Sequence, residues 1–123
     1  MNYYNEIKNE LTNNEIYKKV KDYSKNKKDL TTYYNVGKLL IEAQGGEERA
    51  KYGNKLIKEY SEKLTNELGK GYTTSALKRM RMFYLIIEKG APLAHQMTWS
   101  NYCEIMVIKD INIINYYIRV TIE

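Results

Sequence analysis

Apolar residues recur three or four positions apart along most of this chain, which is the period of an amphipathic α-helix. The clearest stripe lies between residues 52 and 68 and consists of Leu56, Ile57, Tyr60, Leu64 and Leu68. A second stripe runs from Leu30 to Ile41, and it contains Gly37. Because a glycine inside a helix costs about 1 kcal/mol relative to alanine, Gly37 is expected to allow close approach of another element.

The first forty residues also follow a helical period, with two expected interruptions. Thr12 and Glu15 have the spacing of a capping box, which predicts that the first helix restarts near Asn13. The stretch KNKKD at 25–29 is expected to be a solvated bend or a frayed helix end, with Asp29 as the N-cap of the next helix.

Glycines mark the following boundaries, at 45–46, 69–71 and 90. A helix is expected to begin between Glu47 and Tyr52 and to end before Gly69, and another is expected over 74–88 with Thr73 or Thr74 as its cap. In that helix the residues expected on the buried stripe are Leu77, Met80, Tyr84 and Ile87. Those expected to point away from it are Ser75, Lys78, Arg79 and Met82.

The C-terminal third predicts two more helices. Thr98 is placed to cap a helix that carries Trp99, Tyr102, Cys103 and Met106. The stretch from Asp110 to Glu123 suits a helix capped by Asp110 or a β-branched strand, and the helix is favoured. The fold class expected is therefore all-α, a single domain over residues 1–123 built as a compact bundle of about six helices.

Composition and charge narrow the possible partners. The net charge is +5, which favours a polyanion without requiring one. The single cysteine excludes an internal disulfide framework. Neither a run of about 18 apolar residues nor a signal peptide is present, so the chain is expected to be soluble and cytoplasmic, without a membrane partner.

Several chemistries are disfavoured by the residues present. One histidine and one cysteine cannot supply the roughly four ligands of a zinc site, and Cys103 is better explained as a buried structural thiol than as a nucleophile paired with His95. The glycines around Lys70 lack the phosphate-loop pattern. The chain is therefore expected to hold no metal or cofactor, to act on no small-molecule substrate and not to be an enzyme.

The helices at 52–68 and 74–88 have the order and length of a helix-turn-helix pair, which in DNA-binding proteins places the start of its second helix in the major groove. On that interpretation Thr74, Ser75, Lys78, Arg79 and Met82 face DNA, and Lys70 contacts phosphate. Arg81 lies nearer the buried stripe, and it is either a further DNA contact or a structural cation. The alternative is an ordinary bundle pair, because the repressor motif would bury the polar Ser75 and Lys78.

Three segments together resemble the N-terminal domain of YhcG-type proteins of the PD-(D/E)xK nuclease superfamily: YYNVGKLLIEAQ at 33–44, ERAKYGNKLIKEYSEKLTNELGKGYTTSALKRMRMFY at 48–84, and TWSNYCEIMVIKD at 98–110. The chain departs from the family pattern at Tyr34, Tyr60, Tyr72 and Asn101, which replace Trp, Leu, Phe and His. In such proteins this domain precedes a nuclease-like domain. The resemblance therefore implies a non-catalytic module that positions something on DNA, or one that pairs with itself or with a nuclease subunit.

Two functions remain open at this point. The first is a module that binds double-stranded DNA through Lys70, Lys78, Arg79 and Arg81. The second is a protein-interaction module that dimerises, binds a nuclease subunit, or acts as a mobile-element inhibitor of another protein. Its support is a set of aromatic and apolar residues expected to be exposed, namely Tyr3, Tyr4, Met82, Ile86, Tyr116 and Tyr117.

Overall fold

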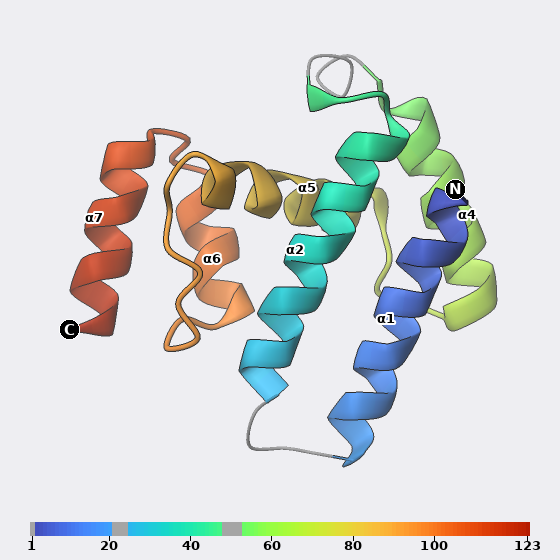
Figure 1. The fold of residues 1–123 in the computed structure, drawn as a ribbon, viewed down its shortest axis with the longest axis horizontal. Coiled ribbons are helices and arrows are strands. Elements are labelled where there is room, and N and C mark those ends of the chain that lie inside the picture. Colours follow the sequence, from blue (N-terminus) through green and yellow to red (C-terminus); the bar gives the residue numbers. More distant parts are fainter. Residues whose placement is uncertain (1, 21–24, 48–52) are drawn as a thin grey trace.

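The computed structural model describes residues 2–20, 25–47 and 53–123, with side chains described for 2–16, 28–47 and 53–123. All the regular structure in these residues is helical, which confirms the predicted all-α class. The helices are α1 (Tyr3–Val20), α2 (Lys25–Ala43), α4 (Lys55–Leu68), α5 (Thr74–Glu88), α6 (Trp99–Met106) and α7 (Ile111–Ile122) (Figure 1).

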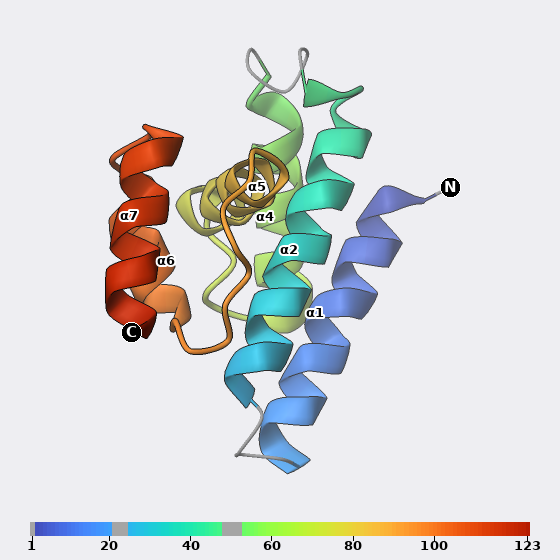
Figure 2. The same cartoon turned by 60° about the vertical axis from the view of Figure 1, so that its left-hand side comes forward.

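Helix α5 crosses the middle of the molecule and connects its two halves. On one side lie the antiparallel pair α1 and α2 together with α4, and on the other side lie α6 and α7 (Figures 1 and 2). The most extensive contacts are those of α2 with α5 and of α1 with α2, whereas α7 packs mainly against α6. Helix α7 is therefore the outermost element at the end of the molecule opposite α4 (Figure 1).

The buried side chains form two clusters, one in each half. The N-terminal core consists of Ile7, Leu11, Val36, Leu40, Ile57, Tyr60, Leu64, Leu77 and Met80. The C-terminal core consists of Leu30, Phe83, Ile86, Ala91, Ala94, Met97, Tyr102, Met106, Ile114 and Ile118. Helices α2 and α5 contribute to both cores, and the partly buried Tyr33 and Trp99 pack against both. The two halves are thus joined by shared side chains as well as by the chain itself.

Gly37 lies where α2 and α5 approach each other, as its position inside a helix predicted. A Cβ atom added there would lie 2.1 Å from the carbonyl oxygen of Met80 and 2.9 Å from the Cβ of Tyr84. The absence of a side chain at Gly37 is what lets the two backbones pack this closely.

The buried phenol of Tyr102 fixes the loop between α5 and α6. Its hydroxyl donates a hydrogen bond to the carbonyl of Pro92 at 2.7 Å and accepts one from the amide of Ala94 at 2.8 Å. A fully buried tyrosine needs such partners, because an unpaired hydroxyl in the core is costly. The loop that carries Ala94 and Met97 into the C-terminal core is held at the same point.

The structure corrects the expected boundaries in the first half. Helix α1 continues through Asn13 without a restart, and α2 already begins at Lys25, so Asp29 lies inside α2 and does not cap it. The Asp29 carboxylate instead accepts a hydrogen bond from the side-chain amide of the buried Asn14 at 2.9 Å. That bond joins α1 to α2, so tertiary contact, and not local capping, accounts for the aspartate.

Two further expectations concern α4 and α5. Helix α4 begins at Lys55, after the non-helical residues 53 and 54, and the expected start between Glu47 and Tyr52 falls mostly on residues 48–52, outside the described part of the chain. In α5 the fully buried stripe includes Phe83 and Ile86, where Tyr84 and Ile87 were expected. Tyr84 and Ile87 are only partly buried, because after Leu77 and Met80 the buried stripe continues at a spacing of three residues where a spacing of four was expected.

The caps predicted for the last three helices are confirmed. Thr73 caps α5 by accepting a hydrogen bond from the amide of Ala76, and Thr98 forms a reciprocal capping box with Asn101 at the start of α6. The Asp110 carboxylate accepts hydrogen bonds from the amides of Asn112 and Ile113, which establishes α7 as a helix and excludes the strand.

Candidate nucleic-acid interface

The segment between α4 and α5 turns back along α4. Gly69 and Gly71 adopt positive φ values of 102° and 110°, which other residues rarely adopt. The Ser61 hydroxyl then donates a hydrogen bond to the carbonyl of Tyr72 at 2.7 Å, so Tyr72 lies beside the middle of α4, well before its C-terminal end. The start of α5 is therefore brought next to the first half of α4.

A second contact holds this segment against α1. The hydroxyl of Tyr72 donates a hydrogen bond to the Glu15 carboxylate, and burial together with this bond raises the pKa of Tyr72. The phenol stays protonated at neutral pH and remains a donor. Tyr72 thus fixes the approach of α5 from two sides, through its carbonyl and through its ring.

The result is a cleft between the first turns of α4 and α5. Its volume is about 500 Å³, and it is lined by Asn54, Lys55, Lys58, Thr74 and Lys78. Three of these five residues carry a positive charge and none is acidic, so the lining as a whole favours an anion. The three lysines are exposed, which leaves their ammonium groups free to pair with a ligand.

The backbone at the start of α4 adds to this preference. The side chain of Asn54, the N-cap residue, makes no capping hydrogen bond. The first amides of a helix have no partner inside the helix, and the helix dipole places partial positive charge on them. The start of α4 therefore adds partial positive charge to that of the lysines, a combination that suits phosphate oxygens.

The structure distributes the sequence-predicted residues unevenly around this cleft. Thr74 and Lys78 line it. Lys70, Ser75 and Arg79 are exposed nearby in sequence, Lys70 in the connection and the other two on α5, but they are not among the lining residues.

Arg79 lies within electrostatic reach of α6. Burial raises the pKa of the Cys103 thiol on α6, and the positive charge of Arg79 partly opposes that rise. Cys103 itself is partly buried against the C-terminal core, in accord with a structural thiol.

In the described part of the chain no group of three His, Cys, Asp or Glu residues is arranged to hold a metal ion.

Arg81 and Met82 take structural positions in α5. The half-buried Arg81 guanidinium donates a hydrogen bond to the side-chain oxygen of Gln44 at 2.8 Å, and burial lowers the pKa of Arg81. Met82 is partly buried against the C-terminal core. Ile86 is only 3% exposed, so the expectation that it lies on the surface was wrong.

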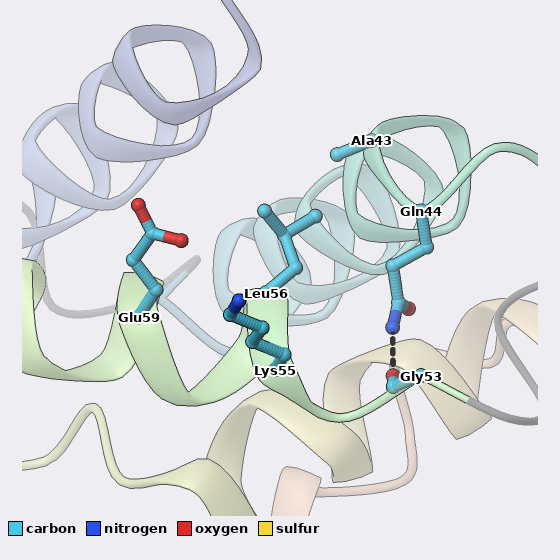
Figure 3. Close-up of a pocket in the computed structure, with 6 residues that line it drawn as sticks. All are labelled: Ala43, Gln44, Gly53, Lys55, Leu56 and Glu59. Carbon is cyan, nitrogen blue, oxygen red and sulfur yellow. Dashed lines mark hydrogen bonds between the residues drawn. The ribbon is translucent and has the colours of Figure 1, made fainter.

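Lys55 also lines a second hollow. Its volume is about 340 Å³, and Figure 3 shows its lining residues, which are Ala43, Gln44, Gly53, Lys55, Leu56 and Glu59. The Gln44 amide nitrogen donates to the carbonyl of Gly53, while the Gln44 oxygen accepts from Arg81. An apolar lining with one acid and one base gives this hollow little attraction for a polyanion, so the three-lysine cleft is the better candidate site.

Sequence reasoning did not single out Lys55 and Lys58. Their separation of three residues does place them on one face of α4. What the sequence did not reveal is that the chain returns along α4 and brings Lys78 to the same face.

None of the described helices combines the length and apolar character needed to cross a lipid bilayer.

Comparison with known proteins identifies the family of this chain. Residues 6–123 match the family described as the DUF1016 N-terminal domain, and the chain belongs to that family. Among individual proteins, it is similar to the "Putative nuclease YhcG" of Escherichia coli (strain K12), at 41% identity over 58 residues. That match covers 46% of this chain and only 16% of the length of the relative. No solved structure matches the chain.

Proposed function

We propose that this chain is a DNA-binding module that holds the phosphate backbone of a duplex in the cleft between α4 and α5. The observation that supports the proposal is the convergence of Lys55, Lys58 and Lys78 in one cleft without an acidic residue in its lining. Lysines neutralise backbone phosphates and release the counterions condensed on DNA, which is the main source of sequence-independent affinity.

The exposed start of α5 would lie next to the bound backbone. Ser75, three residues before Lys78, and Arg79, directly after it, are exposed on α5, and both are proposed to lie at the edge of a duplex that is held by its phosphates at the cleft. In that arrangement the cleft sets the position of the DNA, and α5 contacts the groove. Lys70, exposed in the preceding connection, would add a further phosphate contact.

The module is proposed to position DNA without cutting it. The cleft lining offers ammonium, hydroxyl and amide groups, which bind phosphate, and no carboxylate that would hold a divalent metal against it. The family relationship supports the proposal, because the relative that matches part of this chain carries the name of a nuclease. We accordingly propose a nuclease subunit as a protein partner of the DNA-bound module.

The test is fluorescence anisotropy with a labelled duplex over a salt series, comparing the wild type with Lys58→Ala/Lys78→Ala. Because the slope of log K against log salt is about −0.9 per neutralised phosphate, removing two cleft lysines should make it shallower by about 2. The matched control is Lys38→Ala/Lys89→Ala, which removes the same charge from exposed positions outside the cleft lining.

The control variant is expected to keep nearly the wild-type slope. Equal losses in the two variants would show that binding depends on net charge alone, and the cleft would then not be the site. Absence of wild-type binding at low salt would overturn the DNA-binding proposal altogether. Circular dichroism of each variant would verify that the helices are intact.

A second candidate function, protein interaction, is favoured by a separate observation. Helix α7 exposes large apolar side chains to solvent, among them Tyr116 at 52% and Tyr117 at 48%. This surface lies at the end of the molecule opposite α4, so the two functions use different surfaces (Figure 1).

A further inference from the structure

Helix α7 is apolar on two opposite sides. One side carries Ile114 and Ile118, which are fully buried in the C-terminal core. The other side carries an exposed stripe of Ile113, Tyr116, Tyr117 and Val120, with exposed fractions between 44% and 52%. A helix with apolar side chains on two sides is normally covered on both, so the exposed stripe has the character of an interface.

We propose that the exposed α7 stripe is the contact between two copies of this chain, packed as an antiparallel helix pair about a two-fold axis. In this arrangement the stripe of one copy matches the same stripe of the other copy. With the axis between positions 116 and 117, Ile113 faces Val120 of the partner subunit and Tyr116 faces Tyr117 of the partner subunit. Such self-complementarity is what a two-fold symmetric interface requires.

Charge at the two ends of α7 favours the same arrangement. Lys109 precedes the helix and Glu123 follows it, and both are exposed. Antiparallel packing brings each Lys109 close to Glu123 of the partner subunit. It also sets the positive end of each helix dipole beside the negative end of the other. A parallel pair would place like charges together at both ends.

The stripe is also preorganised by contacts within one copy. The rings of Tyr116 and Tyr117 meet edge to face with centroids 5.4 Å apart, and the Arg119 guanidinium lies 5.9 Å from the centre of the Tyr116 ring. Tyrosine and arginine are the residues most enriched where interfaces gain affinity. Tyr4, also considered as an exposed aromatic residue, is instead partly buried against Tyr60 in the N-terminal core.

Because of its position, α7 can contact a second copy without covering the rest of the molecule. It is the outermost element at one end, while the basic cleft involves α4 and the start of α5 (Figures 1 and 2). Dimerisation through α7 would therefore not cover the cleft. The inference does not depend on DNA binding, and each can fail without the other.

The first test is sedimentation velocity of the purified chain between roughly 10 and 200 µM, a range suited to a small helix-pair interface. The wild type is expected to shift from monomer to dimer as concentration rises. Tyr117→Glu should raise the dissociation constant at least about tenfold, because it places a charge at the centre of the contact. Ile16→Glu, a matched change at an exposed residue of α1, should leave the constant unchanged.

The second test measures the direction of packing by disulfide cross-linking in a Cys103→Ser background. In the antiparallel register, Ile113→Cys and Val120→Cys proteins should cross-link when mixed and much less when oxidised separately. Equivalent positions at 113 would lie about 10 Å apart along the helices, beyond the reach of a disulfide.

Three results would overturn the inference. The wild type could stay monomeric throughout the concentration range. The dimer could be equally stable in Tyr117→Glu, which would place the interface elsewhere. The separate proteins could cross-link as readily as the mixture, which would contradict the antiparallel register. DNA anisotropy of Tyr117→Glu, expected to retain the salt dependence of the cleft, distinguishes a failed interface from a failed DNA site.

Discussion

Gly37 shows how one residue determines the packing of two helices. Helix propensity favours alanine over glycine by about 1 kcal/mol. The added methyl group, however, would lie 2.1 Å from the Met80 carbonyl oxygen, and a backbone atom cannot rotate away as a side chain can. We expect the overlap to outweigh the propensity, so that Gly37→Ala lowers the free energy of unfolding by about 1–3 kcal/mol.

The free energies of unfolding in urea of the wild type, Gly37→Ala and Lys38→Ala, measured in parallel, would test this effect. Lys38 is the next residue in the same helix and is exposed, so its replacement should change stability by no more than about 0.5 kcal/mol. A Gly37→Ala protein as stable as the wild type would show that α2 and α5 can separate at little cost.

Tyr34 makes stability dependent on alkaline pH. Its hydroxyl donates a hydrogen bond to the Glu88 carboxylate at 2.7 Å, and this bond, with burial, raises the pKa of Tyr34 to about 12. An unfolded tyrosine titrates near pH 10. Between these values the unfolded chain releases a proton that the folded chain retains, so the contribution of Tyr34 is complete below pH 10 and is lost as pH rises toward 12.

Comparison of the wild type with Tyr34→Phe across this range isolates the contribution of the phenol. The wild type should be the more stable protein below pH 10, and the difference in unfolding free energy should shrink steadily above it. A tyrosine with a raised pKa whose causes include neither Tyr34 nor Glu88, such as Tyr60, titrates alike in both proteins and cancels in the difference. A difference that is constant with pH would mean that the Tyr34–Glu88 bond does not form in solution.

At the scale of elements, the helices could be predicted from the sequence better than the contacts between them. Helix α7 could be predicted because Asp110 is a strong N-cap and Ile114 and Ile118 share one face. The early start of α2 could not be predicted, because Asp29 has the local chemistry of a cap while its actual partner, Asn14, is 15 residues away. A local pattern cannot distinguish a capping aspartate from one that joins two helices.

The candidate cleft shows the same limit. Thr74 and Lys78 could be predicted from their place at the start of α5. Lys55 could not, since its role depends on the course of the chain through 69–73, which the Ser61–Tyr72 hydrogen bond determines. Likewise the sequence of α5 alone does not show that Phe83 and Ile86 continue its buried stripe, because both positions are buried by the C-terminal core. These are effects of tertiary packing, and the sequence of a single helix does not show them.

At the scale of the whole molecule, two cores are linked into what should be one cooperative unit. Trp99 packs against both cores, with its ring 5.2 Å from that of Phe83 and 4.6 Å from that of Tyr33. Helices α2 and α5 also supply buried residues to both. Loss of either core would expose shared apolar surface in the other, which disfavours a half-folded state.

The single tryptophan of the sequence allows a direct test of that cooperativity. Denaturant unfolding followed by Trp99 fluorescence, which reports on the junction, should have the same midpoint as unfolding followed by circular dichroism, which reports on all helices. Leu64→Ala, a cavity in the N-terminal core remote in sequence from Trp99, should cost about 2–5 kcal/mol and should lower both midpoints equally. If this substitution moved the circular dichroism midpoint and left the fluorescence midpoint in place, the halves would unfold separately. The DNA cleft and the α7 stripe would then no longer be held at a fixed position relative to each other, because α4 belongs to one half and α7 to the other.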